Sequence, residues 1–522
     1  MRPPEAEGVS EPKRLQTGAT AVSRKLCRDA QLVIDAPIPA PLLKVSETQI
    51  SEMQISETKS SETELAETRP AGTMNCLSQY YRCPERYARL THGGALSQKH
   101  GYFRFGEDTL YGQCAGQQPA AAPTEALWDA LQDVSFENGS PCLPFDVTEV
   151  VDNLRWEMYA NDWRDKRAAS LLASVYYLVR PFLPLFIRKR LQKIHLRGWQ
   201  DIPFPHWPVD RTVDNLLEHL LLLSLRAQNL TQIPFIWFWP EGASGCALMT
   251  HDVETPLGVD LCPMLMDLND SFGIKASFQI IPEERYRVTP AFLQSIRDRG
   301  FEVVIHDLNH DGRLFRDRKC FVERAAKINA YGKQFGATGF RAGVLYRNQL
   351  WYDLLDFEYD MSVPNVAHLD PQRGGCCTVM PYFIGNVLEI PVTTVQDYTL
   401  FHILNDCSTT LWERQIELIM EKHGLISVVI HPDYLTSARA RNNYEALLAH
   451  LSQLKAKANL WVATPGEVNN WWRQRSQMTL VEQDGQWRIE GAGKERASIA
   501  FASEQDGRLV LSLNPAPLAV GS

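Results

Sequence analysis

The stretch from Gly245 to about Arg475 alternates short apolar runs with segments of helical periodicity, and this alternation restricts the fold more than any other feature. Runs of this length are typical of fully buried strands. Parallel strands need a long crossover connection, which a helix usually supplies, so repeated strand–helix units predict a parallel sheet. We therefore predict an α/β protein whose sheet is closed into a barrel or doubly wound.

The expected elements can be read directly from these runs. The strand candidates are Cys246–Thr250, Ala276–Ile281, Phe301–Ile305, Gly339–Arg341, Tyr359–Val363, Leu388–Val392, Ile426–Ile430 and Leu460–Ala463. The helical stretches between them include Val259–Phe272, Thr289–Arg299, Asp317–Phe335, Leu411–His423 and Tyr444–Lys457.

The rest of the chain divides by composition into three further parts. Residues 1–73 carry a five-residue repeat that begins at Ser46, and a period of five holds no apolar face together, so we expect a disordered extension. Residues 74–244 form an accessory region with expected helices at Leu127–Val134, Val147–Tyr159, Arg167–Leu178 and Val213–Leu225. Residues 476–522 alternate as exposed strands and predict a small β appendage and tail.

Composition excludes several classes of protein. The net charge of −9 and the pI near 5.9 argue against a nucleic-acid-binding surface. The most apolar segment, Ala168 to Ile187, is interrupted by Arg180, Pro181 and Pro184, so we expect no transmembrane helix and at most peripheral contact with a membrane. The cysteines show no CxxC spacing, and the first residues lack the apolar core of a signal peptide. These features predict a cytoplasmic protein with reduced thiols.

Two of the strand candidates are followed by residues that bind metals. Asp252 and Glu254 follow one apolar run, and their spacing of two makes them point the same way on an extended segment. His306 and His310 follow another run, and their spacing of four predicts that one helical turn places both on one face.

One carboxylate and two imidazoles are a typical ligand set for a catalytic divalent metal, with a position left open for water. Two acids that converge on one point would also repel each other without a cation. We therefore predict that Glu254, His306 and His310 bind one metal ion and that Asp252 acts as a base. Zinc is the default for this set, and nickel, cobalt or manganese fit the same ligands.

Three more polar residues stand at later strand ends. Arg341, between small residues, can pair with a carboxylate, as part of the site or as a structural salt bridge. Asp360 is a functional carboxylate or a turn residue. His431 ends the strongly apolar run Leu425–Ile430 and precedes a proline, a position that favours a general acid over a surface histidine.

Taken in this order, the motifs resemble those of the polysaccharide deacetylase family, the NodB-like carbohydrate esterases, in the branch whose first motif is Asp-x-Asp/Glu. The resemblance covers a little under half of the chain and implies a deformed (β/α) barrel of about seven strands. It also implies a role for each matched residue: Asp252 as base, Glu254, His306 and His310 as metal ligands, Arg341 as the arginine that orients the base, His431 as general acid and Asp360 as the carboxylate that tunes it.

The same resemblance implies hydrolysis of an N-acetyl group on a sugar of a polysaccharide or glycan precursor, with release of acetate. Its partner would be an N-acetylated carbohydrate. Two alternatives stay open: hydrolysis of a small cyclic amide or ureide on the same fold, and a carbohydrate-binding protein without catalysis. The five matched metal and acid–base residues favour an enzyme, since a decayed site usually loses at least one of them.

Overall fold

The computed structural model describes residues 75–163 and 196–515. These residues all belong to one compact unit, Val45–Ser522. The predicted extension over residues 1–73, the predicted helix Arg167–Leu178 and the segment Ala168–Ile187 lie outside the described residues.

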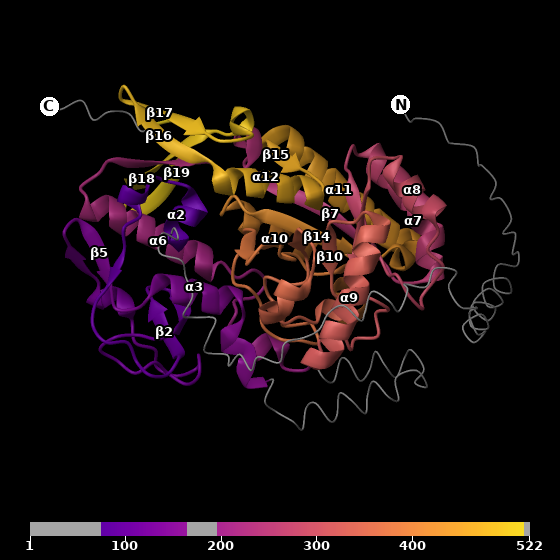
Figure 1. The fold of residues 1–522 in the computed structure, drawn as a ribbon, viewed down its shortest axis with the longest axis horizontal. Coiled ribbons are helices and arrows are strands. Elements are labelled where there is room, and N and C mark those ends of the chain that lie inside the picture. Colours follow the sequence, from indigo (N-terminus) through magenta and orange to yellow (C-terminus); the bar gives the residue numbers. More distant parts are fainter. Residues whose placement is uncertain (1–74, 164–195, 516–522) are drawn as a thin grey trace, which may run out of the picture. The chain divides into compact units, whose positions relative to one another are not determined.

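The largest sheet among the described residues has nine strands (Figure 1). Its order is β12-β13-β11-β10-β9-β8-β7-β14, and β15 also pairs with β7. Apart from the antiparallel pair β12–β13, all of these pairings are parallel. The strands are β7 (Gly245–Val253), β8 (Ala276–Ile280), β9 (Glu302–His306), β10 (Gly339–Arg341), β11 (Tyr359–Asp360), β12 (Tyr382–Ile384), β13 (Val387–Glu389), β14 (Leu425–Ile430) and β15 (Leu460–Val462).

The two ends of this sheet are joined by a few hydrogen bonds, most of them from threonine side chains, instead of a strand ladder. Beyond β13, Thr393 donates from Oγ1 to the carbonyl of Leu425 at 2.7 Å and accepts from the backbone N–H of Ser427 at 2.8 Å. The backbone N–H of Thr394 also donates to the carbonyl of Ser427 at 3.3 Å. The predicted α/β class is confirmed, and this imperfect closure is consistent with a deformed barrel.

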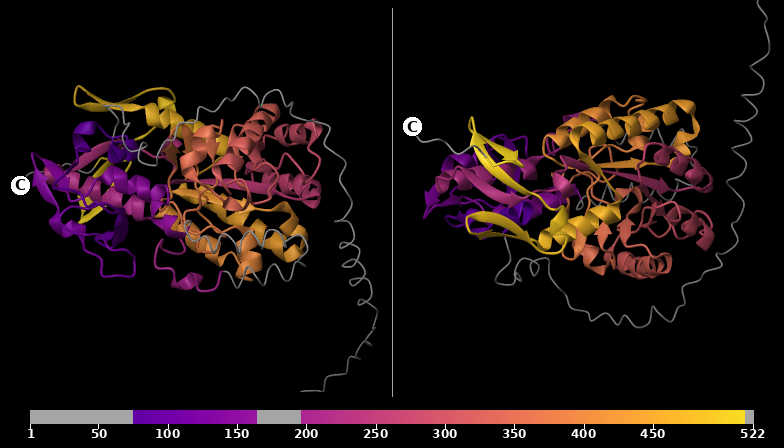
Figure 2. Two further views of the ribbon diagram at one scale, coloured as in Figure 1. Left: turned by 60° about the horizontal axis from the view of Figure 1, so that its bottom comes forward. Right: turned by 90° about the horizontal axis from the view of Figure 1, so that it is seen from above.

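Helices follow the strands in the predicted alternation and lie on the outside of the curved sheet (Figure 2). Short polar residues start several of them: the side chains of Thr255, Thr289 and Asp317 accept hydrogen bonds from the first-turn N–H groups. The helices are α7 (Pro256–Ser271), α8 (Pro290–Arg297), α9 (Arg318–Phe335), α10 (Thr410–Met420), α11 (Ala438–Ala458) and α12 (Pro465–Gln477).

Both faces of the sheet are buried, which explains why its strands read as continuous apolar runs. All residues of β7 and β14 are buried. The outer face packs on the helices in one apolar cluster that includes Phe340 and Ile305. The inner face contributes Leu248, Val304 and Tyr359 to a second cluster, which continues into the accessory region.

The accessory region contains more strand than its sequence suggested. The predicted helices at Val147–Tyr159 and Val213–Leu225 are found as α3 (Val147–Arg155) and α6 (Thr212–Ala227). The prediction of a helix at Leu127–Val134 is wrong, because only a 3₁₀ turn forms at Ala130–Asp133 before the chain enters β4. The remaining elements are α2 (Cys76–Tyr81), β1 (Thr91–His92), β2 (Gly101–Phe105), β3 (Asp108–Gly112), β4 (Ser135–Glu137), β5 (Ser140–Leu143) and β6 (Gln232–Ile236).

The last part of the chain forms two antiparallel pairs. They are the hairpin of β16 (Thr479–Gln483) with β17 (Gln486–Glu490), and the pair of β18 (Ile499–Gln505) with β19 (Arg508–Ser512). β18 also pairs with β6 of the accessory region. Within residues 75–163 and 196–515, no helix has the length and apolar content that a membrane span requires.

Candidate active site

The polar residues predicted from the strand ends meet at one edge of the parallel sheet. Asp252 lies in β7, while His306 and Arg341 are the last residues of β9 and β10 and stand opposite each other in register. His431 follows β14 directly. Because parallel strands bring their carboxyl ends to the same edge, residues far apart in the sequence lie together at one end of the barrel. All four are buried.

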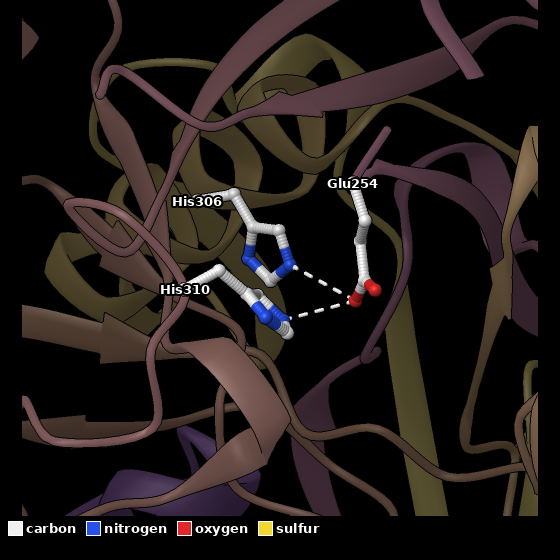
Figure 3. A group of neighbouring side chains, drawn as sticks. All are labelled: Glu254, His306 and His310. Atoms are coloured by element: carbon white, nitrogen blue, oxygen red, sulfur yellow. Dashed lines mark ion pairs between the residues drawn. The ribbon is translucent and has the colours of Figure 1, made fainter. Parts of the chain in front are cut away.

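Glu254, His306 and His310 point toward one another and form a site that fits a metal ion (Figure 3). One ligand atom from each lies within 4.8 Å of the others. Oε1 of Glu254 is 2.9 Å from Nε2 of His310 and 3.8 Å from Nε2 of His306. Both Nε2 atoms are buried and lack an aligned hydrogen-bond partner. Buried polar atoms rarely stay unpaired, and coordination of one divalent ion would satisfy both.

The route by which the two histidines meet differs from the prediction. The helical turn expected for His306 and His310 is wrong, because His306 ends β9 and the next residues form an irregular loop in which His310 has a φ of 55°. Arg285 holds this loop by donating to the carbonyls of Asn309 at 3.1 Å and of His310 at 2.6 Å. The rings still face each other, with centroids 4.9 Å apart. Nδ1 of His306 lies 3.1 Å from the carbonyl of Arg341, a contact that orients the ring.

Asp252 is paired with Arg341, as the sequence suggested. Nη1 of Arg341 donates to Oδ1 of Asp252 and to Oγ1 of Thr250, both at 2.7 Å. Burial raises the pKa of Asp252, but the positive charge of Arg341 and the nearby imidazoles of His306 and His431 outweigh it, so the pKa is lowered overall. The other oxygen, Oδ2, is 3.7 Å from Nε2 of His306 and faces the metal-binding group. Asp252 is therefore held as a carboxylate beside the site.

His431 has a carboxylate partner, but the partner is Asp397 and not the predicted Asp360. Oδ1 of Asp397 is 2.7 Å from Nδ1 of His431, and its Oδ2 accepts the backbone N–H of the same histidine at 2.8 Å. Nε2 of His431 is 3.4 Å from Oε1 of Glu254. Burial lowers the pKa of His431, but Asp397 and Glu254 outweigh it and raise the pKa well above its usual value. The imidazolium therefore presents its remaining N–H to the metal-binding group.

Asp360 lies on the other face of the sheet, and strand alternation explains why. It stands opposite Phe340, whose side chain packs against the outer helices, whereas the neighbouring Tyr359 fills the inside of the barrel next to Gly339. Asp360 accepts hydrogen bonds from the backbone N–H and the hydroxyl of Ser362 at 2.9 and 2.8 Å. It is a buried outer-face carboxyl and has no contact with His431.

Asp397 could have been found from the sequence by the same rule that found the others. It follows the strand candidate Leu388–Val392 by five residues, and acids just beyond a strand end of a parallel barrel are candidates for the mouth. Asp397 was missed because it lies five residues beyond the strand candidate, whereas the other site residues stand at or close to a strand end. The site therefore combines a metal-binding trio with an ionised carboxylate, Asp252, and a charged imidazole, His431.

Comparison with known proteins gives matches at the level of structure only. No family model and no curated protein matches the chain. Similar solved structures include a Mycobacterium smegmatis protein assigned as a polysaccharide deacetylase, which is 18% identical over 46% of this chain and 93% of that one, with a TM-score of 0.36. Puue allantoinase is 12% identical over 45% and 92% of the chains, with a TM-score of 0.34.

A third similar structure is the peptidoglycan deacetylase PdaC of Bacillus subtilis, 13% identical over 44% of this chain and 93% of that one, with a TM-score of 0.27. Polysaccharide deacetylases, the family predicted from the sequence motifs, are therefore among the solved structures that this chain resembles.

Proposed function

We propose that this protein is a metal-dependent hydrolase that removes the acetyl group from an N-acetylated sugar. The observation that carries the proposal is the meeting of Glu254, His306 and His310 within 4.8 Å, with two buried imidazole nitrogens that face the Glu254 carboxylate without an aligned hydrogen bond. This group lies between the carboxylate of Asp252 and the imidazolium of His431. The sugar as substrate rests on the resemblance of the sequence motifs to polysaccharide deacetylases.

Glu254, His306 and His310 would hold the ion, because the two buried Nε2 atoms already face the same carboxylate oxygen of Glu254. A divalent metal, when bound, polarises an amide carbonyl and acidifies water. Zinc is the expected ion.

Asp252 is the proposed base. Arg341 keeps its carboxylate ionised and aims Oδ2 toward the metal-binding group, so that it can accept a proton from an attacking water. Because Arg341 itself is anchored by Thr250 and by the carbonyl of Met361, the carboxylate is fixed before substrate arrives.

His431 is the proposed acid. Asp397 accepts from Nδ1 and so leaves the proton on Nε2 facing the mouth. Cleavage of an acetamide creates an amine that must gain a proton to depart, and His431 can supply it. The products are acetate and a free amino sugar, and Asp252 and His431 exchange protonation states in one turnover.

The proposal is tested by metal content and acetate release. The wild-type chain should bind about one zinc per chain and release acetate from N-acetylated glucosamine oligomers, and a His306→Ala/His310→Ala variant should lose both. A His92→Ala/His100→Ala variant, which removes two exposed histidines, is the matched control and should keep both. A wild-type chain that binds no divalent metal contradicts the proposal. If the chain binds metal and hydrolyses a cyclic ureide but releases no acetate from the sugars, the substrate is the ureide.

A further inference from the structure

A buried ion pair connects the accessory region to the barrel near the candidate site. Glu157 follows α3, and Arg347 lies in the loop after β10; each is 2% exposed. Nε of Arg347 donates to Oε2 of Glu157 at 2.7 Å, and Nη2 donates to Oε1. Such a two-point pairing fixes the direction of the guanidinium as well as its position.

Arg347 uses its remaining nitrogen on the loop that precedes it. Nη1 donates to the carbonyl of Leu345 at 2.9 Å. Val344 and Leu345 have φ values of 61° and 52°, in the left-handed region that a β-branched residue such as valine rarely adopts. Two such residues in succession are stable only where surrounding contacts hold them. The Arg347 side chain supplies one of those contacts.

This loop lies directly beside the metal-binding group. A Cβ atom added at Gly343 would stand 2.8 Å from Cδ2 of His310 and 2.6 Å from Oδ2 of Asp307, so the backbone of the loop packs on the histidine. Leu345 in turn lines a cavity together with Thr394 and Thr399, on either side of Asp397. The loop therefore lies between the metal ligand His310 and the connection that carries Asp397.

The accessory region also contributes to the lining of this cavity. Trp207 lines it and stacks on His368, with ring centroids 5.9 Å apart. The backbone around Trp207 is fastened to the barrel, because the N–H of Asp210 donates to Asn365 at 2.8 Å and the amide of Asn365 donates back to the carbonyl of Asp210 at 2.7 Å. The cavity thus has one wall from the barrel and one from the accessory region.

Glu157 also holds a second barrel loop. Its Oε1 accepts the backbone N–H of Gly375 at 2.7 Å. Gly374 has a φ of 123°, and a Cβ atom there would stand 2.5 Å from the same oxygen, so this approach requires glycine. One carboxylate of the accessory region therefore organises both the loop after β10 and the glycine pair after β11.

We propose that the accessory region completes the candidate active site: Glu157, acting through Arg347, fixes the Gly343–Leu345 loop, which packs on His310 and lines the small Trp207 cavity. Glu157 and Arg347 are positioning residues, because they act on the site through this loop. The expected change in KM rests on the proposed function, whereas the expected loosening of the Gly343–Leu345 loop does not.

The expected loosening of this loop is tested by hydrogen–deuterium exchange of the full chain, followed in peptides that cover residues 341–349. In Glu157→Gln three amides should exchange roughly tenfold faster. They are those of Leu345 and Tyr346, which donate to carbonyls within the loop, and that of Arg347, which donates to the side chain of Gln372. The matched control is Glu218→Gln, because Glu218 also joins the accessory region to the barrel, through Lys422 at 2.5 Å. Unchanged exchange in Glu157→Gln, or an equal increase in both variants, overturns the proposal.

The expected change in KM is tested by acetate release from N-acetylated glucosamine oligomers. In Glu157→Gln the KM should rise about tenfold with a smaller change in kcat, because the loop beside the site and not the acid–base pair is disturbed. Arg347→Lys keeps the positive charge but loses the two-point pairing with Glu157, so its KM should lie between those of Glu157→Gln and the wild type. Glu218→Gln should match the wild type, and unchanged KM in Glu157→Gln despite faster exchange overturns the role in substrate binding.

Two outcomes are separated by this design. A wild-type chain that releases no acetate refutes the proposed function, while the exchange of residues 341–349 still decides whether Glu157 fixes the loop. If Glu157→Gln does not fold, the double variant Glu157→Gln/Arg347→Gln replaces it, because it leaves no buried charge without a partner.

Discussion

Two groups of carboxyls lie on opposite faces of the same parallel sheet, and their surroundings give them opposite acidity. On the inner face, Asp252 and Glu254 stand among Arg341 and three histidines, and the pKa of each is lowered although burial alone would raise it. On the outer face, Asp360 and Glu389 stand opposite each other in register on β11 and β13. Burial raises the pKa of both, and the neighbouring Asp360 raises that of Glu389 further.

The difference shows that burial does not determine whether an acid is charged. Cations within reach make the inner pair useful for holding a metal and accepting a proton. On the outer face, burial and the neighbouring Asp360 outweigh the positive charge of Arg347, so the pKa of Glu389 is raised and the two acids are expected to share a proton. The inner face is therefore expected to govern activity and the outer face to govern stability.

The largest effect is expected from Asp252→Asn. The substitution keeps the shape of the side chain but removes the proposed base, so kcat for acetate release should fall by about 10²- to 10⁴-fold. Zinc content should remain near that of the wild type, because Asp252 is not one of the three metal ligands. Activity within a few-fold of the wild type would show that another group accepts the proton.

Arg341→Gln should affect both activity and stability. It leaves Asp252 buried without its cation, and loss of one partner of a buried pair typically costs about 3–5 kcal/mol of unfolding free energy. The pKa of Asp252 should rise toward neutrality, since burial then acts with less opposition. Urea denaturation measures the first effect, and the pH dependence of kcat/KM measures the second. A variant as stable as the wild type would mean that Asp252 finds another partner.

Asp397→Asn and Asp360→Asn are matched variants that compare, through kcat, the carboxyl beside the site with a carboxyl on the outer face of the sheet. Loss of the charged hydrogen bond to His431 should lower kcat by about 10- to 100-fold in Asp397→Asn. Asp360→Asn should leave kcat within about twofold, because its contacts are with Ser362 on the outer face. Equal losses of kcat in the two variants would contradict the assignment of Asp397 as the partner of His431.

The smallest effect is expected from Glu389→Gln, measured as unfolding free energy against pH. A raised folded pKa gives a contribution to stability that is complete below the ordinary value of 4.5 and is lost as the pH rises through the folded value. Above pH 4.5 the wild type should therefore lose stability relative to Glu389→Gln, by at most about 1.4 kcal/mol per pH unit. Parallel pH curves for the two proteins would show that Glu389 does not hold a proton.

The barrel could be predicted because its signals are local. β7 and β14 are buried on both faces, so they appear in the sequence as unbroken apolar runs, and the parallel arrangement places their polar followers at one edge. The loop geometry of His306 and His310 could not be predicted, because Arg285 from the preceding strand connection sets it. The spacing of the two histidines was informative even though the helical turn inferred from it was wrong.

The accessory region was hard to read for the opposite reason. Its strands β1 and β4 are short and exposed, so no periodic apolar pattern marks them. The partner of Glu157 lies 190 residues further along the chain, and no sequence rule connects two such charges. Asp360 was misplaced because a strand of two residues gives no alternation from which to decide which face its acid occupies.

The pairing of β6 with β18 has a consequence for how the protein is made. Ile236 stands opposite Ile499 in this sheet, so the sheet cannot be complete until the ribosome has added the 263 residues that separate them (499 − 236). At about 5–20 residues per second this takes on the order of 13–50 s. The buried Arg475, which donates to the carbonyls of Tyr80 and Ile236, likewise joins the accessory region only late in synthesis. During synthesis the accessory region therefore cannot complete its contacts until nearly the whole chain has been made.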